Sequence, residues 1–166
     1  MHDQMLMTLH IRFSRSHGAH PALDGAAASC CLRTTTTTIN MSLTIQSQNK
    51  VFEGVLTKYS FRSKVLGGLE AKMNVFLPES ANAGHKVPVL YFLSGLTCTE
   101  DNAAQKGHFF EAAAKEQLAI VFPDTSPRGA NIPGEEDSWD FGTGAGFYVN
   151  ATKEPWNKYY NMYDHV

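Results

Sequence analysis

Hydrophobic and polar positions divide the chain after residue 50 into alternating runs and continuous apolar runs. The longest continuous run, Val87 to Leu93, has no charged residue and contains β-branched and aromatic side chains. Such a run predicts a strand buried on both faces, as in the middle of a parallel sheet. Leu118 to Phe122 predicts a second short apolar strand, which Pro123 closes.

Between these two strands the pattern becomes helical. From Asn102 to Gln117, apolar residues recur at helix-like spacings, and charged residues occupy the positions between them. Gly107 divides this helix into a short first piece and a longer second one. A strand, a helix and a strand joined by a right-handed crossover form a parallel pair, so the expected fold class is α/β.

The junction between the first of these strands and the helix is the candidate for chemistry. Ser94-Gly95 permits a sharp turn, because glycine has no Cβ, and the helix begins past Thr99 with Asp101 or Asn102 as its cap. A buried strand, a glycine turn and a helix start aim backbone N–H groups at one point, which suits an anion or a developing oxyanion. Most such junctions in α/β proteins are only connections, and the local pattern leaves both interpretations open.

Two alternating runs precede these elements. Apolar and polar residues alternate from Val55 to Phe61, and from Leu69 to Leu77 the apolar residues share one face opposite charged and amide side chains. Alternation of this kind predicts strands buried on one side. The turn Leu66-Gly67-Gly68 between them predicts an antiparallel hairpin, placed at a sheet edge. Pro78 ends the second strand, and Glu79 to Lys86 is expected to be a polar loop.

A long irregular segment follows, from Thr125 to Thr152, rich in glycine and aromatic residues. Connections of this length inside compact domains are usually functional or disordered, and the aromatic content argues against disorder. Its glycines Gly142, Gly144 and Gly146 resemble a dinucleotide-binding loop only superficially, because the full G-x-G-x-x-G spacing and a preceding strand are missing. Pro155 to Val166 predicts the start of an amphipathic helix.

The composition indicates one globular domain. The chain has 166 residues, 43% hydrophobic and 18% charged, which suffices for one core and is too short for two domains. The formal net charge of −2 gives no electrostatic case for nucleic acid or for an anionic membrane surface. No apolar run approaches the roughly 20 residues of a membrane span. The three cysteines (Cys30, Cys31 and Cys98) match neither a disulfide framework nor a zinc motif, so we expect a reducing compartment, no metal and no cofactor.

Residues 1 to 40 differ from the rest of the chain. They hold four of the seven histidines and a run of five threonines, with no sustained apolar period. We expect a disordered leader or N-terminal extension ahead of an internal start at Met41. The arginine, serine and threonine content faintly resembles a mitochondrial transit peptide, which is the alternative. The histidine spacing fits no metal-ligand motif.

Three motifs carry a resemblance to a known family. They are LSGLTCTE (Leu93 to Glu100), PDTSPRG (Pro123 to Gly129) and SWDFGTGAGFYV (Ser138 to Val149), and in this order and spacing they resemble S-formylglutathione hydrolase, or esterase D. With the flanking strands, the resemblance covers Met41 to Val166. It implies an α/β-hydrolase fold and a serine thioesterase that hydrolyses S-formylglutathione to formate and glutathione and accepts small esters. It also implies a cytoplasmic homodimer without a cofactor.

The chain departs from this family at the nucleophile. The resemblance implies a serine in a G-x-S-x-G elbow after the fifth strand, followed by aspartate and histidine. No G-x-S-x-G occurs in the sequence, since Ser94 has no glycine two residues before it and Ser126 is followed by Pro127. We therefore expect residues 41–166 to form an incomplete α/β-hydrolase domain, its N-terminal half, without the Ser-Asp-His triad.

The remaining site residues are carried over from the resemblance. In this fold one oxyanion donor is a backbone N–H in the loop between the third strand and the first helix, and by resemblance that donor is Leu96. Cys98 is similar to a pocket-lining cysteine that makes these enzymes sensitive to thiol reagents. Trp139 and Phe147 are expected to shape the acyl or glutathione pocket.

Two classes of function follow. In the first, the chain is a shortened hydrolase that keeps the oxyanion loop but is inactive alone. In the second, it is a non-enzymatic product that binds a full-length subunit or is degraded. A cysteine mechanism, with Cys98 as nucleophile and His108 as base, is weaker. A helix that starts at Asn102 would place His108 roughly 9 Å along the helix axis from that start, which is too far for direct contact with the loop that holds Cys98.

Overall fold

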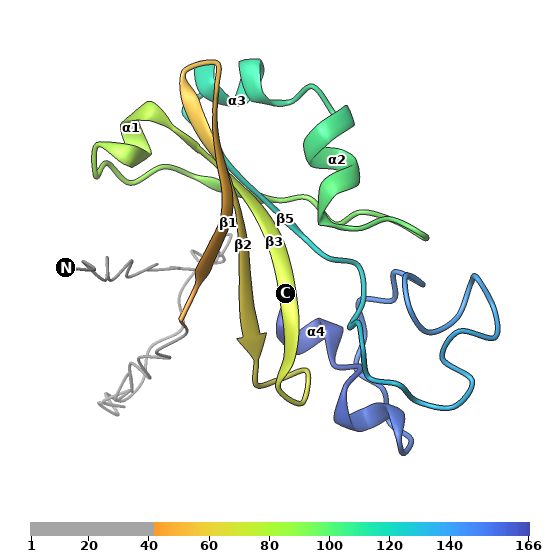
Figure 1. Ribbon diagram of the computed structural model, residues 1–166. Coiled ribbons are helices and arrows are strands. Elements are labelled where there is room, and N and C mark those ends of the chain that lie inside the picture. Colours follow the sequence, from red (N-terminus) through yellow and green to blue (C-terminus); the bar gives the residue numbers. More distant parts are fainter. Residues whose placement is uncertain (1–41) are drawn as a thin grey trace, which may run out of the picture. The chain divides into compact units, whose positions relative to one another are not determined.

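The computed structural model describes residues 42–166, in which a five-stranded mixed sheet packs against short helices (Figure 1). The sheet order is β1-β2-β3-β5-β4. The strands are β1 (Thr44–Val51), β2 (Gly54–Ser63), β3 (Leu69–Pro78), β4 (Val89–Tyr91) and β5 (Ala119–Pro123). The prediction of a leader over residues 1–40, followed by a start at Met41, lies outside the described residues.

The predicted antiparallel hairpin is confirmed, because β2 pairs with β3 in a continuous register from Gly54–Pro78 to Ser63–Leu69. Its placement at the sheet edge is wrong, since β1 pairs antiparallel with β2 on the outer side. The sequence TIQSQNKV of β1 is mostly polar, and all of its residues except Val51 are exposed. A strand with no buried face leaves no apolar alternation in the sequence, so the pattern gave no sign of β1.

One-sided burial of β3 holds only over its first half. Ala71 is buried between two exposed charged residues, as the alternation predicts. From Asn74 onward the more deeply buried positions are the even-numbered ones, and Phe76 has no exposed surface. Helices α2 (Glu100–Lys106) and α3 (Phe110–Lys115) pack against this part of β3, so the opposite face is covered as well.

The predicted strand–helix–strand unit is confirmed, with β4 and β5 parallel and two helices between them. Gly107 caps the C-terminal end of α2 and so divides the helical segment as expected. Thr99, rather than Asp101 or Asn102, is the N-cap of α2. Thr99 and Asn102 form a capping box, in which each side chain accepts a backbone hydrogen bond of the other's turn.

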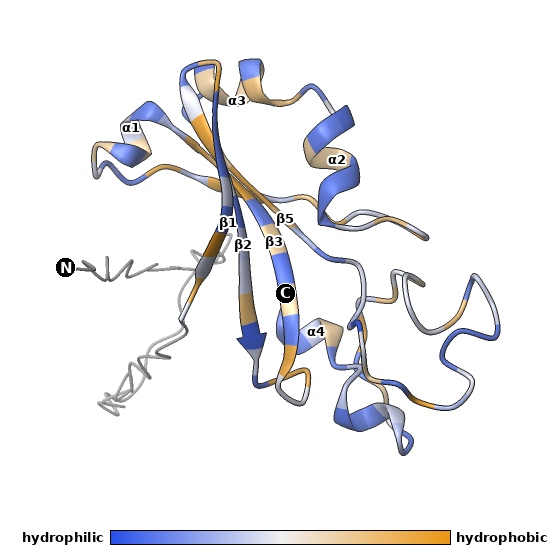
Figure 2. Cartoon of the chain, in the orientation of Figure 1, coloured by the Kyte–Doolittle hydropathy of each residue, from blue (hydrophilic) through white to orange (hydrophobic). Residues whose placement is uncertain are grey.

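The main core lies between the sheet and these helices. Small alanines of α2 and α3 allow the helices to approach the aromatic side chains of β3 and β5. The rest of α2 is mostly hydrophilic (Figure 2). The rings of Phe76 and Phe110 are 5.0 Å apart between centroids, and those of Phe92 and Phe109 are 5.1 Å apart. Every residue of β5, which lies between β3 and β4 in the sheet, is buried.

The strand predicted at Val87 to Leu93 forms over Val89–Tyr91 only, and its predicted central, buried position is wrong. In the described part of the chain β4 is an edge strand paired only with β5. Its residues are exposed, with Leu90 at 46%. The apolar run predicts burial on both sides, yet nothing among residues 42–166 covers the outer edge. The described residues therefore form an α/β fold whose sheet is open at the β4 edge.

Two further expectations need correction. The polar loop predicted after Pro78 contains one helical turn, α1 (Glu79–Asn82). The amphipathic helix predicted from Pro155 is broken into a 3-10 turn, η1 (Trp156–Lys158), and a short helix, α4 (Met162–His165). Only Met162 of its expected apolar face is buried. The segment between Pro123 and Pro155 is irregular, as predicted, and lies past the end of β5 (Figure 1).

Candidate active-site loop

The loop from Ser94 to Thr99 connects the edge strand β4 to helix α2 and is called the 94–99 loop below. Its backbone turns sharply at Thr97, which has a left-handed φ of 63°. The capping box fixes its C-terminal end, because Asp101 N–H donates to Thr99 Oγ1 and Thr99 N–H donates to Asn102 Oδ1. The loop is thus held where it enters the helix.

Three polar backbone groups of the 94–99 loop are bound by the long segment that follows β5. Thr97 N–H donates to the Gly144 carbonyl at 2.8 Å, and Tyr148 OH donates to the Ser94 carbonyl at 2.8 Å. The Cys98 carbonyl accepts from Thr125 Oγ1 at 2.5 Å and from Arg128 Nη2 at 3.3 Å. Segments that lie far apart in the sequence therefore hold this loop in one conformation.

Leu96 lies in the part of the loop whose backbone N–H groups are unbound. Within residues 42–166, the Leu96 N–H donates to no acceptor, as is also true of Ser94 and Gly95, while Thr97 N–H and Cys98 N–H both donate to carbonyl groups. Leu96 is 38% exposed. An unbound N–H in a loop that other hydrogen bonds hold in place is a donor available to a ligand oxygen.

Arg128, which contacts the loop, forms an ion pair with Asp124. Arg128 Nε donates to Asp124 Oδ2 at 2.6 Å, and Arg128 Nη2 donates to Asp124 Oδ1 at 2.9 Å. These hydrogen bonds raise the pKa of the Arg128 guanidinium. A bidentate pair restricts the orientation of the guanidinium more than a single contact does. Arg128 is therefore held where it can reach the Cys98 carbonyl.

Burial raises the pKa of Tyr148 to about 12, with a smaller contribution from Asp124. The phenol therefore keeps its proton at neutral pH and remains a donor to the Ser94 carbonyl.

The first turn of α2 is tied to the sheet by a charged cluster. Lys58 Nζ of β2 lies 2.8 Å from Glu100 Oε1 and 2.6 Å from Asp101 Oδ2. Asn74 Nδ2 of β3 donates to the Glu100 carbonyl and to Asp101 Oδ1. Glu100 is buried, so its carboxylate depends on this lysine for compensation. The cluster fixes the helix that immediately follows the 94–99 loop.

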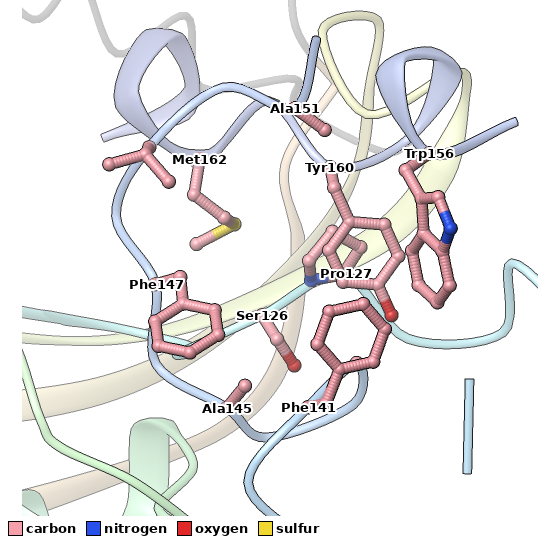
Figure 3. A pocket seen from close by; sticks show the side chains of 11 residues that line it. Ser126, Pro127, Phe141, Ala145, Phe147, Ala151, Trp156, Tyr160 and Met162 are labelled. Carbon is pink, nitrogen blue, oxygen red and sulfur yellow. The ribbon is translucent and has the colours of Figure 1, made fainter. Parts of the chain in front are cut away.

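A small apolar cavity of about 120 Å³ lies beside the long segment (Figure 3). It is lined mainly by aromatic and small side chains, among them Phe141, Ala145, Phe147, Trp156, Tyr160 and Met162. The Trp156 ring packs edge-on against Phe141 and Tyr160, with centroids 4.9 and 5.0 Å apart. Tyr160 OH donates to the buried Glu135, which fixes the ring.

The structure places the residues singled out from sequence in different surroundings. Leu96 and Cys98 share the 94–99 loop, and Phe147 lines the cavity. Trp139 does not line it, and its side chain is 69% exposed. Trp156 and Tyr160, which do line it, were not found from the sequence, because they belong to a segment interpreted as a plain amphipathic helix.

No serine or cysteine in the described part of the chain combines access to a substrate with the partners of an activated nucleophile. Ser126 Oγ accepts the Gly144 N–H, and no hydrogen bond within residues 42–166 joins Cys98 to His108. A serine–histidine hydrogen bond does link Ser63 Oγ to His165 Nδ1 at 3.1 Å. Ser63 is 3% exposed and cannot meet a substrate, so we assign this pair no catalytic role.

Within residues 42–166, no three potential metal-binding side chains come together, and no helix is long and apolar enough to cross a membrane.

Comparisons with known proteins identify the sheet and its helices as a partial α/β-hydrolase-like esterase fold. Residues 63–165 match the esterase family described as "Putative esterase". The chain is 52% identical over 126 residues to S-formylglutathione hydrolase of Mus musculus, which covers 76% of this chain and 44% of that protein. The Arabidopsis thaliana S-formylglutathione hydrolase is 50% identical over 117 residues, covering 70% of this chain and 40% of that protein.

A solved S-formylglutathione hydrolase structure from Agrobacterium tumefaciens superposes with a TM-score of 0.69 and 43% identity. The match covers 73% of this chain and 43% of that one. The chain belongs to the S-formylglutathione hydrolase family of esterases, and it spans less than half the length of the relatives it matches.

Proposed function

We propose that the described segment supplies the oxyanion-binding loop of an esterase that hydrolyses S-formylglutathione to glutathione and formate. The free Leu96 N–H, on a loop held at both ends and in the middle, is the observation that carries this proposal. The family membership and the names of the relatives support the choice of substrate.

The chemistry assigned to Leu96 is stabilisation of negative charge. When a nucleophile attacks a thioester carbonyl, the carbonyl oxygen gains charge, and an N–H aimed at its new position lowers the barrier. Loss of one such donor typically costs on the order of 10²–10³ in kcat. Because this donor belongs to the backbone, side-chain substitutions that keep the loop conformation leave it in place.

Two further residues shape the proposed substrate site. Phe147 lines the apolar cavity, which suits a small acyl group, and Cys98 lies half-buried two residues beyond Leu96. Trp139 is exposed and remains available to the glutathione part of the substrate. The glutathione thioester and small esters are thus the proposed substrates.

The chain by itself is proposed not to turn over substrate. Thioester hydrolysis by this route needs a nucleophile, a base that takes its proton and a group that orients the base. The 166 residues contain no G-x-S-x-G, and the described serine that is hydrogen-bonded to a histidine, Ser63, is buried. Purified chain should show no turnover of S-formylglutathione. Activity that survives purification and disappears in Cys98→Ala would contradict this and favour a cysteine mechanism.

A hybrid enzyme tests the assignment of Leu96. The 126 aligned residues of the mouse relative are replaced by the corresponding residues of this chain. We expect the hybrid to hydrolyse S-formylglutathione. Leu96→Pro, which removes the N–H, should then lower kcat about 10²–10³-fold. Leu96→Ala, which keeps the N–H, is the matched control, and an equal loss in both variants would reject the backbone donor.

The open edge of β4 favours a second candidate, a non-enzymatic role in which the chain binds another subunit of the family. An exposed strand edge can accept a strand from another chain. Mixing the chain with the mouse enzyme and measuring complex formation by analytical ultracentrifugation distinguishes this candidate. A mixture that sediments as two independent species would eliminate it.

A further inference from the structure

The glycine-rich segment Gly142–Gly146 is not explained by dinucleotide binding, since no strand precedes it and its spacing is incomplete. Its three glycines all have left-handed φ angles, 73°, 79° and 73°. Residues with side chains rarely adopt such angles, so each position favours glycine. The structure gives two of these glycines a common neighbour, the 94–99 loop.

Gly144 bridges the long segment and the loop. Its N–H donates to Ser126 Oγ at 2.7 Å, and its carbonyl accepts the Thr97 N–H at 2.8 Å. A Cβ added at Gly144 would lie 3.8 Å from Thr97 Cα, an ordinary contact. Gly144 therefore needs to be glycine for its φ angle and not for lack of space.

Gly146 is different, because its backbone lies directly against the peptide that carries the free donor. A Cβ added there would come within 3.2 Å of Gly95 C, 3.3 Å of Leu96 N and 3.4 Å of Gly95 O. These three atoms belong to one peptide plane, the plane whose N–H is unbound. An alanine at 146 would press on this plane and turn or displace the Leu96 N–H.

Tyr148 fixes the preceding peptide plane. Its hydroxyl donates to the Ser94 carbonyl, so the peptide between Ser94 and Gly95 is held by the same segment of the chain. Gly146 and Tyr148 thus restrain two consecutive peptide planes from one short stretch. Rotation of the Leu96 N–H would have to disturb one of these contacts.

We propose that Gly146 and Tyr148 are positioning residues that hold the Gly95–Leu96 peptide so that the Leu96 N–H faces the substrate site. The use of this N–H in catalysis rests on the proposed function, but the contact itself does not. A test on the full chain that reads out the Leu96 amide directly therefore separates the two.

The test compares three glycine-to-alanine variants of the full 166-residue chain by ¹⁵N NMR. Gly146→Ala adds the contact with the peptide. Gly144→Ala has similar φ strain beside the loop without close contact, and Gly84→Ala has it at a remote site with nothing within 4 Å. We expect the Leu96 amide resonance to shift more in Gly146→Ala than in either control.

Equal Leu96 shifts in all three variants would overturn the proposal, because strain alone would then explain them. If Gly146→Ala does not fold while Gly144→Ala does, Tyr148→Phe decides the matter. This change removes one hydroxyl and keeps the ring. A shifted Gly95 amide together with a shifted Leu96 amide supports the positioning role, and unchanged resonances at both overturn it.

Discussion

The Cys98 carbonyl accepts two side-chain hydrogen bonds from the segment that follows β5. Thr125 has no exposed surface and donates to this carbonyl, and Arg128 reaches it while paired to Asp124. A carbonyl with two lone pairs can accept both donors. Loss of either donor should loosen the 94–99 loop but should not remove the Leu96 N–H.

Thr125→Val should lower the free energy of unfolding by about 1 kcal/mol, because it removes one buried hydrogen bond and keeps the side-chain shape. Urea denaturation followed by circular dichroism measures the change. Thr125→Ser keeps the hydroxyl and serves as the control for that bond. A valine variant as stable as the wild type would show that the hydroxyl contributes nothing.

Cys98 should react with iodoacetamide under native conditions. It is the one cysteine among residues 42–166, it forms no disulfide and its residue is partly exposed. Peptide mapping distinguishes Cys98 from Cys30 and Cys31, and Thr125→Val should increase its labelling rate if loop opening limits access. Absence of label on Cys98 after native treatment would mean that packing closes the site.

At the scale of elements, charged and polar side chains of the sheet hold α2 in position. It has only seven residues, and a helix this short gains most of its stability from tertiary contacts. Lys58 on β2 meets both acidic residues of its first turn, and Asn74 on β3 binds the same turn. The start of α2, and with it the end of the 94–99 loop, is therefore registered on the sheet.

Lys58→Met should destabilise the chain by about 3 kcal/mol, because it leaves the buried Glu100 carboxylate without its cation. Thermal unfolding monitors the effect. The control is Lys115→Met, which breaks an exposed pair with Glu111 on α3 and should change little. Equal effects in both variants would show that the buried lysine has no special role.

Asp101 should make stability depend on acid pH. Burial opposes ionisation, but hydrogen bonds from Lys58 and Asn74 outweigh it and lower the pKa of Asp101. A lowered folded pKa means that the stabilisation is fully present above the ordinary carboxyl pKa and is lost as pH falls through the folded value. The stability difference between wild type and Asp101→Asn should therefore shrink below about pH 4. Asp137→Asn, an exposed carboxylate of the long segment, is the control.

At the scale of the whole molecule, the main feature of the described residues is the open edge of the sheet at β4. Val89, Leu90 and Leu93 are each at least 45% exposed along the β4 edge. Neighbouring strands in a sheet satisfy each other's backbone groups, and the outer groups of β4 meet no strand in the described chain. This edge lies directly before the 94–99 loop.

The chain should self-associate through β4. Leu90→Lys adds a charge to the edge and should shift sedimentation toward the monomer at micromolar concentration. Phe52→Lys changes a similarly exposed residue in the β1–β2 turn and should leave association unchanged. If both variants associate like the wild type, the β4 edge is not the contact.

The sequence predicted elements that have a buried face and missed those that do not. The hairpin, β5 and the division at Gly107 follow from apolar periodicity and from glycine. The strand β1 was not predicted, because its side chains are exposed on both faces. β4 was placed in the centre because its apolar run predicts a neighbour that the described residues do not contain.

The candidate site could be predicted only in part. The strand–glycine–helix junction pointed to the 94–99 loop as a candidate, but the Tyr148–Ser94 and Thr125–Cys98 contacts join residues far apart in the chain. Local pattern carries no information on such pairs. A Cβ at position 146 would come within 3.3 Å of Leu96 N. In the sequence this close packing appears only as a glycine without an assigned role.

The strand order β3-β5-β4 also sets the order in which the chain can fold during synthesis. β1, β2 and β3 pair with sequence neighbours, so the meander can form as soon as Pro78 has left the ribosome. β4 is made before β5, yet β5 is its sole partner among these strands, so β4 must wait for Pro123. The residues that bind the 94–99 loop emerge later still, between Thr125 and Tyr148. The 94–99 loop is thus synthesised early and becomes ordered late.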